Sequence, residues 1–167
     1  MDRRLFFKTA ALLGLEASSL QAGVKGDPVV HFVDDPGEWF SVRHGWVTCD
    51  AERTPNGSWS CEITIYVRQI DFEGGFQERR MVPTDLLKSA LEEAGLETEF
   101  DGCPLFPSLV GHLPPSASPS SVLTSIRQIM DGADQRSLWV DLFPQEWANY
   151  RMSIPAPGPE IRVPRPA

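Results

Sequence analysis

The stretch Trp59–Arg68, WSCEITIYVR, decides the fold class, because its side chains alternate between apolar and polar along its whole length. The apolar set is Trp59, Cys61, Ile63, Ile65 and Val67, and the other set is Ser60, Glu62, Thr64, Tyr66 and Arg68. A period of two over this length is typical of a strand that buries one face and exposes the other in an antiparallel sheet. We therefore expect an antiparallel sheet that contains this strand.

The residues before this strand predict two further strands and a tight turn. Thr54–Gly57, TPNG, is a strong turn signal. Trp39–Val47 reads as one strand ahead of that turn, and Val29–Val33 reads as a short strand ended by the turn cluster DDPGE. In the longer strand one side would carry Phe40, Val42, His44 and Trp46. The first half of the chain therefore predicts a small antiparallel sheet.

The second half of the chain predicts two helices. The first begins after Thr84, a suitable N-cap, and ends at Gly95; the second has Ser118 as its cap, Pro119 in its first turn and Gly132 at its end. Their apolar stripes comprise Leu86, Leu87, Ala90, Leu91 and Ala94, and Val122, Leu123, Ile126, Ile129 and Met130. The predicted fold class is α+β, a small antiparallel sheet with about two helices packed on one face.

Three segments complete the predicted organisation. Residues 104–119 read as a proline- and serine-rich connection, Leu138–Phe143 as a strand, and the sequence from Pro155 onward as a tail without regular structure. We expect a signal segment at 1–22, a single α+β domain at 23–154 and a proline-rich tail at 155–167.

Composition narrows the classes of partner. The chain has 167 residues, of which 41% are hydrophobic, so it is large enough to form a core. The first 22 residues contain three basic and two acidic side chains, so the rest of the chain carries a net charge of −9. Such an acidic body argues against binding to nucleic acid and against adhesion to anionic lipid.

The N-terminus has the three parts of a bacterial secretory signal in order: a positive start, the apolar stretch Thr9–Leu15 and small residues up to Gly23. The apolar stretch is too short to span a bilayer, so no stable membrane anchor is expected. DRRLFFK resembles the twin-arginine signal pattern at Arg3, Arg4, Phe6 and Lys8. The resemblance implies a bacterial protein exported already folded, and thus periplasmic or secreted. The alternative is an N-terminal helix packed on the core, although these apolar side chains surround a helix instead of forming one stripe.

The cysteine pattern predicts one disulfide. Cys49 and Cys61 flank the Thr54–Gly57 turn, and a hairpin centred there brings them nearly opposite each other. In an exported protein we expect these two to pair and Cys103 to stay free.

Two short segments suggest an enzymatic alternative. VRHGWVT (Val42–Thr48) and LVGHLP (Leu109–Pro114) resemble the Arg-His-Gly and later Gly-His motifs of histidine phosphatases. That resemblance implies His44 as nucleophile, Arg43 as phosphate clamp and His112 as a stabiliser of the transition state. Arg79 or Arg80 would be a second clamp.

The favoured function is binding. Neither the histidines nor the cysteines show the spacing of a zinc site, and no cofactor motif is found, so we expect no metal and no cofactor. Trp39, Trp46 and Trp59 gather on the predicted hairpin and would, if exposed, form a recognition surface. The sequence thus predicts a small exported accessory or inhibitor-type protein that acts through a protein partner, with a histidine phosphatase-like enzyme as the alternative.

Overall fold

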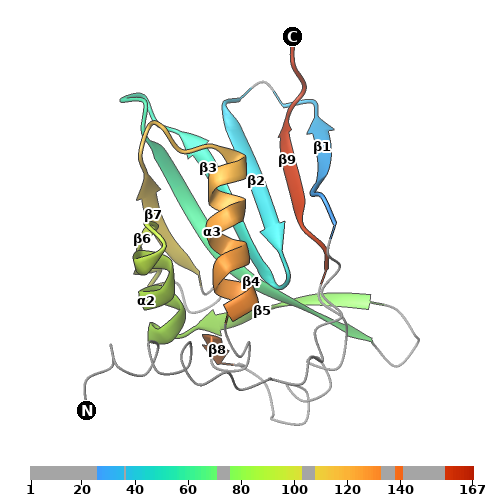
Figure 1. The fold of residues 1–167 in the computed structure, drawn as a ribbon, viewed down its shortest axis with the longest axis vertical. Coiled ribbons are helices and arrows are strands. Elements are labelled where there is room, and N and C mark those ends of the chain that lie inside the picture. Colours follow the sequence, from blue (N-terminus) through green and yellow to red (C-terminus); the bar gives the residue numbers. More distant parts are fainter. Residues whose placement is uncertain (1–25, 36, 71–75, 103–107, 133–137, 141–156) are drawn as a thin grey trace.

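The computed structural model (Figure 1) describes residues 26–35, 37–70, 76–102, 108–132, 138–140 and 157–167. The predicted signal segment at 1–22 and Cys103 lie outside these residues. None of the helices that the structure describes is long and apolar enough to cross a membrane.

The described residues form one mixed sheet of nine strands. Its strands are β1 (Val29–Val33), β2 (Trp39–His44), β3 (Val47–Arg53), β4 (Trp59–Ile70), β5 (Phe76–Pro83), β6 (Glu97–Phe100), β7 (Leu109–Leu113), β8 (Trp139–Val140) and β9 (Glu160–Pro164). The order across the sheet is β1-β9-β2-β3-β4-β5-β8, and β7 lies between β4 and β6. Every pair is antiparallel except β1 with β9. The predicted α+β class is confirmed, with one parallel pair that the sequence did not indicate.

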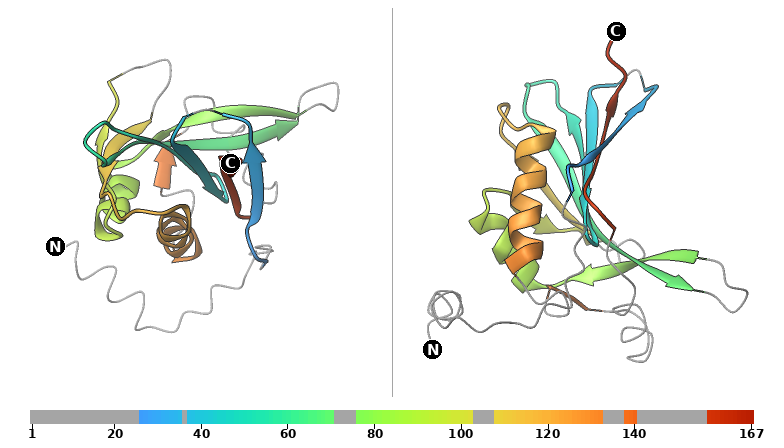
Figure 2. Two further views of the ribbon diagram at one scale, coloured as in Figure 1. Left: turned by 90° about the horizontal axis from the view of Figure 1, so that it is seen from above. Right: turned by 45° about the vertical axis from the view of Figure 1, so that its right-hand side comes forward.

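In the described part of the chain, two helices cover one face of this sheet, as predicted (Figures 1 and 2). They are α2 (Asp85–Glu93) and α3 (Pro119–Gly132). The side chain of Thr84 caps α2 by accepting a hydrogen bond from the Leu87 amide at 3.3 Å, and Gly95, with a φ of 86°, follows its end. The caps therefore lie where the sequence places them.

The core lies between the helices and the facing side chains of the strands. Trp59, Cys61, Ile63 and Ile65 of β4 are all buried, which confirms the predicted apolar face of this strand at these four positions. From the helices the buried residues are Leu87, Leu91, Val122, Leu123, Ile126 and Met130. We call the helix-covered side of the sheet the inner face and the other side the outer face.

The single strand predicted over Trp39–Val47 is wrong, because the chain reverses at Gly45 and Trp46 and forms the β2–β3 hairpin. Gly45 has a φ of 59°, which a glycine adopts without steric cost. The carbonyl of Trp46 accepts a hydrogen bond from the Tyr66 amide at 2.8 Å, so the turn is attached to β4. The turn at Thr54–Gly57 is confirmed between β3 and β4.

The segments expected to lack regular structure contribute two strands. Residues 109–113, inside the predicted connection 104–119, form β7, which pairs with β4 on one side and β6 on the other. The strand forms although the segment is rich in proline and serine, because the prolines flank the strand and do not interrupt its hydrogen bonds.

The expectation of an irregular tail at 155–167 is also wrong, since β9 lies between β1 and β2. Proline lacks only the amide donor, and its carbonyl still accepts. The Pro159 carbonyl accepts from the Val29 amide and the Pro157 carbonyl accepts from the Gly45 amide, each at 3.1 Å. The prolines around β9 therefore anchor the strand at its neighbours.

Gly111 is required where β6 and β7 meet. A Cβ at this position would lie 2.0 Å from the carbonyl oxygen of Glu97, which is backbone and has no room to move. We therefore expect Gly111→Ala to lower the free energy of unfolding by at least about 2 kcal/mol, as overpacking does. Urea denaturation followed by circular dichroism measures this change.

Gly132→Ala is the matched control for Gly111→Ala, because a Cβ on Gly132 meets no atom within 4 Å. The control should leave stability unchanged or raise it by up to about 1 kcal/mol. Equal effects of the two substitutions would contradict the close approach of β6 and β7.

Candidate functional site

A concavity of about 260 Å³ lies on the outer face, across four neighbouring strands. Its lining is entirely polar and consists of Ser41, Arg43, Thr48, Asp50, Tyr66, Glu160 and Arg162. The strand register explains this gathering. Arg43 lies opposite Thr48 on one side and Glu160 on the other, and Ser41 lies opposite Asp50 and Arg162. Adjacent strands thus present their outward-facing polar residues side by side.

Charges of both signs line this concavity. Arg162 Nη2 lies 3.5 Å from Glu160 Oε2, and His31 Nε2 of β1 lies 3.9 Å from the same oxygen. Glu160 is therefore held between a guanidinium and an imidazole, and its partner on the neighbouring strand β2 is Arg43. A surface of this kind can hydrogen-bond to carboxylates through its arginines and to cations through its carboxylates.

Tyr66, the residue of β4 that lines the concavity, is held in place by Arg80 of β5. Arg80 Nε donates a hydrogen bond of 2.9 Å to the hydroxyl oxygen of Tyr66, and its guanidinium carbon lies 5.4 Å from the centre of that ring. Arg80 Nη1 also lies 3.4 Å from Glu62 Oε1. These contacts hold the Tyr66 ring in one orientation at the edge of the concavity.

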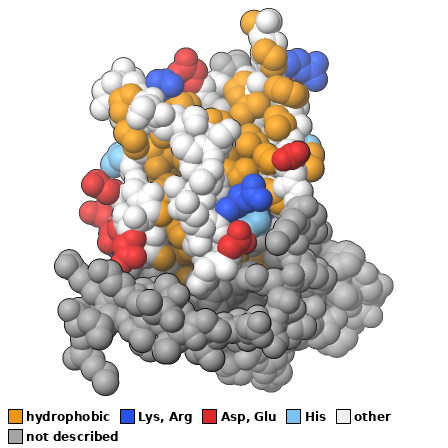
Figure 3. Space-filling view, viewed as in Figure 1, with side chains coloured by type: hydrophobic (Ala, Val, Ile, Leu, Met, Phe, Trp, Pro, Cys, Tyr) orange, Lys and Arg blue, Asp and Glu red, His pale blue; other side chains and the backbone are white. Residues whose placement is uncertain are grey.

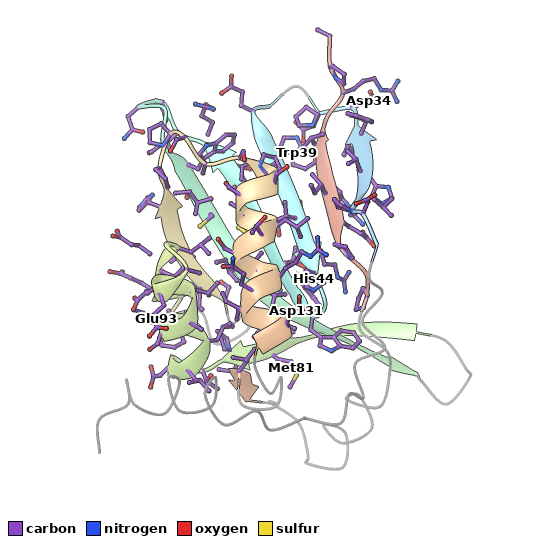
Figure 4. All side chains as sticks on the ribbon, viewed as in Figure 1. Asp34, Trp39, His44, Met81, Glu93 and Asp131 are labelled. Carbon is purple, nitrogen blue, oxygen red and sulfur yellow. The ribbon has the colours of Figure 1, made fainter. Side chains whose placement is uncertain are left out.

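The predicted phosphatase residues are not brought together. Arg43 faces the outer side, whereas its neighbour His44 faces the inner side, where its Nε2 lies 3.4 Å from Asp131 Oδ1 of α3 (Figure 4). His112 lies on β7, opposite Ser60 and Glu97, and β3 and β4 separate β7 from β2. Alternation along a strand sends consecutive side chains to opposite faces, so Arg43 and His44 cannot act on one phosphoryl group. Arg80, one of the two suggested clamps, is used at Tyr66.

The environment of His44 favours the neutral imidazole. Burial lowers the pKa of His44 below its usual range, and the hydrogen bond and charge of Asp131 offset part of this effect. The positive charge of Arg127 lowers the pKa further. His44 is therefore a structural contact between β2 and the end of α3.

The predicted recognition surface of Trp39, Trp46 and Trp59 is wrong, because two of these side chains are buried. Trp46 and Trp59 are only 1% and 7% exposed and belong to the core, so they cannot form an exposed recognition surface with Trp39. The ring of Trp59 packs edge-on against Phe40 with centroids 4.8 Å apart, and the guanidinium of Arg53 lies 4.4 Å from the Trp59 ring centre. Of the three, only Trp39 is partly exposed, and it precedes Ser41 on the outer side of β2.

The predicted disulfide is not formed in this structure, in which Cys49 and Cys61 are free, buried thiols. The assumed register is wrong by two residues: Cys49 lies opposite Ile63, and Cys61 lies opposite Ala51. The two cysteines are therefore diagonal neighbours on the inner face. A hydrogen bond between them, together with burial, raises the pKa of Cys49 well above its usual range, and the same bond lowers the pKa of Cys61.

Sequence reasoning missed most of this site. Thr48, Asp50 and Tyr66 belong to the polar sets of alternating strands and could have been found from that alternation. Glu160 and Arg162 lie in the segment expected to be an irregular tail, although they alternate with Ile161 and Val163 in the pattern of a short strand. Within the described part of the chain, no three His, Cys, Asp or Glu side chains are grouped so that they could hold a metal ion.

No protein-family model, curated protein or solved structure matches the chain.

The lowered pKa of His44 predicts a pH-dependent contribution to stability. Below about pH 6.5 an unfolded histidine takes up a proton, whereas buried His44 does so only at lower pH. As the pH falls from 7 through the pKa of the unfolded side chain, the stability due to neutral His44 declines, by at most about 1.4 kcal/mol per pH unit. Chemical denaturation at several pH values should show this decline in wild type and a flatter profile in His44→Asn.

His112→Asn is the control, because His112 is exposed on β7. Its pH profile should follow that of wild type. If His44→Asn and wild type lose stability in parallel between pH 7 and pH 5, His44 is not held neutral by burial.

Proposed function

We propose that this chain is an exported accessory or inhibitor-type protein that binds a protein partner through the outer face of its sheet. The observation that carries the proposal is the concavity on the face that α2 and α3 leave open (Figure 2), where two arginines and two carboxylates lie within one patch. Strands hold these side chains in a fixed pattern, and such a pattern of charges selects a partner by electrostatic complementarity.

The lining of the concavity favours a protein partner over a small-molecule substrate. Sites for small ligands are usually larger, roughly 300–1,000 Å³, and mostly apolar, with a few polar groups that set orientation. This concavity has a volume of about 260 Å³, and each of its lining residues is polar. It therefore resembles part of a protein interface in which hydrogen bonds and charge pairs set specificity.

Export is supported by the N-terminal pattern. Arg3 and Arg4, followed by Phe6 and Lys8, resemble the twin-arginine signal, which implies that the protein meets its partner in the periplasm or outside the cell. Free, buried thiols at Cys49 and Cys61 are compatible with a chain that folds in the reducing cytoplasm before it is exported.

Replacement of Arg3 and Arg4 by lysine should keep the chain in the cytoplasm in its uncleaved form. The reason is that the twin-arginine pattern needs both guanidinium groups, which an ammonium does not reproduce. Cell fractionation and intact-mass measurement check this outcome. Wild-type-like amounts of the doubly substituted chain in the periplasm would exclude this export route.

Arg162→Glu should weaken partner binding at least about tenfold, because it places a third carboxylate beside Glu160 and Asp50 in the concavity. The assay is capture by the tagged full chain from periplasmic extract, with quantitative mass spectrometry of the recovered proteins.

Arg165→Glu makes the same change of charge outside the concavity, where Arg165 pairs with Asp34 at 3.1 Å, and it should leave capture unchanged. Equal recovery of every captured protein by wild type, Arg162→Glu and Arg165→Glu would contradict the proposed interface.

A further inference from the structure

β1 forms an edge of the sheet and exposes apolar side chains on both of its faces. Val29 and Phe32 are each 56% exposed, Val30 is 46% exposed and Val33 is 39% exposed. Figure 3 shows hydrophobic side chains gathered at the side of the molecule where Figure 1 places β1 and β9. Edge strands are usually protected by lysine, proline or a bulge. Val29–Val33 contains no lysine and no proline. This edge is thus suited to pairing with another strand.

The backbone of β1 divides into groups that bond to β9 and groups that point away from it. The Val29 amide donates to the Pro159 carbonyl at 3.1 Å, and the Val33 carbonyl accepts from the Arg165 amide at 2.9 Å. In a parallel pair, alternate residues direct both backbone groups toward the same neighbour. Val29, His31 and Val33 therefore face β9, while Val30 and Phe32 turn their amides and carbonyls to the outer edge, which has no strand partner in the described part of the chain.

We propose that β1 pairs antiparallel with β1 of a second copy of this chain, around a two-fold axis at His31. This register places Val30 opposite Phe32 of the second copy, and the reverse, so that the outward backbone groups of both residues form four hydrogen bonds. His31 then lies opposite His31 of the second copy as a pair without backbone hydrogen bonds between them.

A second copy fits this edge because β1 is self-complementary. The two residues whose backbones point outward are separated by one position, which is the spacing that a two-fold axis on the intervening residue requires. The same axis places Val29 opposite Val33 of the second copy, so all four apolar residues meet apolar residues. An unrelated strand would satisfy the backbone but would match these side chains only by coincidence.

The size of the contact sets its strength. Five residues from each copy are far fewer than the roughly 20–30 per partner of a standard interface. The acidic body also repels itself, since the chain carries a net charge of −8. We therefore expect a weak, reversible dimer that added salt strengthens by screening this repulsion.

If the proposed function holds, the dimer also has a consequence for partner binding. An antiparallel pair keeps equivalent faces of two sheets on the same side. The concavities of both copies would open on one continuous outer face, with their β2 strands five inter-strand spacings apart, about 24 Å. A partner with two equivalent segments could then bind both.

Cysteine crosslinking tests the register in the full chain, with Cys103→Ser as the background. His31→Cys should form a covalent homodimer on mild oxidation, because facing side chains lie roughly 4.5–5.5 Å apart at Cβ. Val30→Cys and Phe32→Cys should crosslink mainly when mixed with each other. Val110→Cys, exposed on β7, is the control and should give at least tenfold less covalent dimer than His31→Cys.

Sedimentation velocity over a range of concentrations gives an independent measurement. Wild type should show a rising average mass, and Phe32→Lys, which puts a charge on the edge, should remain monomeric. A monomeric wild type at every concentration, or crosslinking of His31→Cys no greater than that of Val110→Cys, would overturn the dimer. So would covalent capture of a different protein by His31→Cys in place of a second copy.

Failure of the dimer and failure of the proposed function can be told apart. A monomer that still captures a partner in an Arg162-dependent way overturns the dimer alone. A crosslinked dimer that captures nothing supports the β1 pairing and overturns the partner interface.

Discussion

The pairing of β4 with strands on both of its sides is the constraint on which the rest of the structure depends. β4 bonds to β3 along one edge, and to β7 and then β5 along the other. Its alternation of apolar and polar residues assigns one face to the core and the other to solvent. Because register in a sheet passes from strand to strand, β4 also determines which residues of β3, β2 and β9 share its outer face. The concavity follows from this register, since its lining residues lie on β4, β3, β2 and β9.

The inner and outer faces have different tasks. On the inner face, Trp46, Phe40, Ile63 and Ile65 are buried in the core, and His44 contacts Asp131 of α3. On the outer face, polar side chains line the concavity, and Arg80 holds Tyr66 in place through its contacts. This separation explains why Trp46, Trp59 and His44 serve packing here, while Arg43, next to His44 in the sequence, lines the concavity on the other face. Consecutive residues on a strand cannot share a site across the sheet.

The C-terminal strand links the two surfaces to which we assign function. β9 carries Glu160 and Arg162 into the concavity, and it also supports β1 at the sheet edge. His31 of β1 contacts Glu160, so the edge strand and the concavity share one carboxylate. Without β9, β1 would have no strand partner among the described residues, and the concavity would lose one acidic and one basic group.

Local pattern and tertiary pairing determined different parts of this protein. The sequence by itself determined β4, the Thr54–Gly57 turn and both helices with their buried stripes, because periodicity, turn residues and caps act over a few neighbouring positions. The hairpin at Gly45, the strands β7 and β9, and the diagonal placement of Cys49 and Cys61 were decided only by the tertiary structure. β7 has no strict alternation and β9 alternates over only four residues, so both become strands because neighbouring edges offer them hydrogen bonds. The candidate site belongs to this second group, since its residues are far apart in sequence and meet only when β9 enters the sheet beside β2.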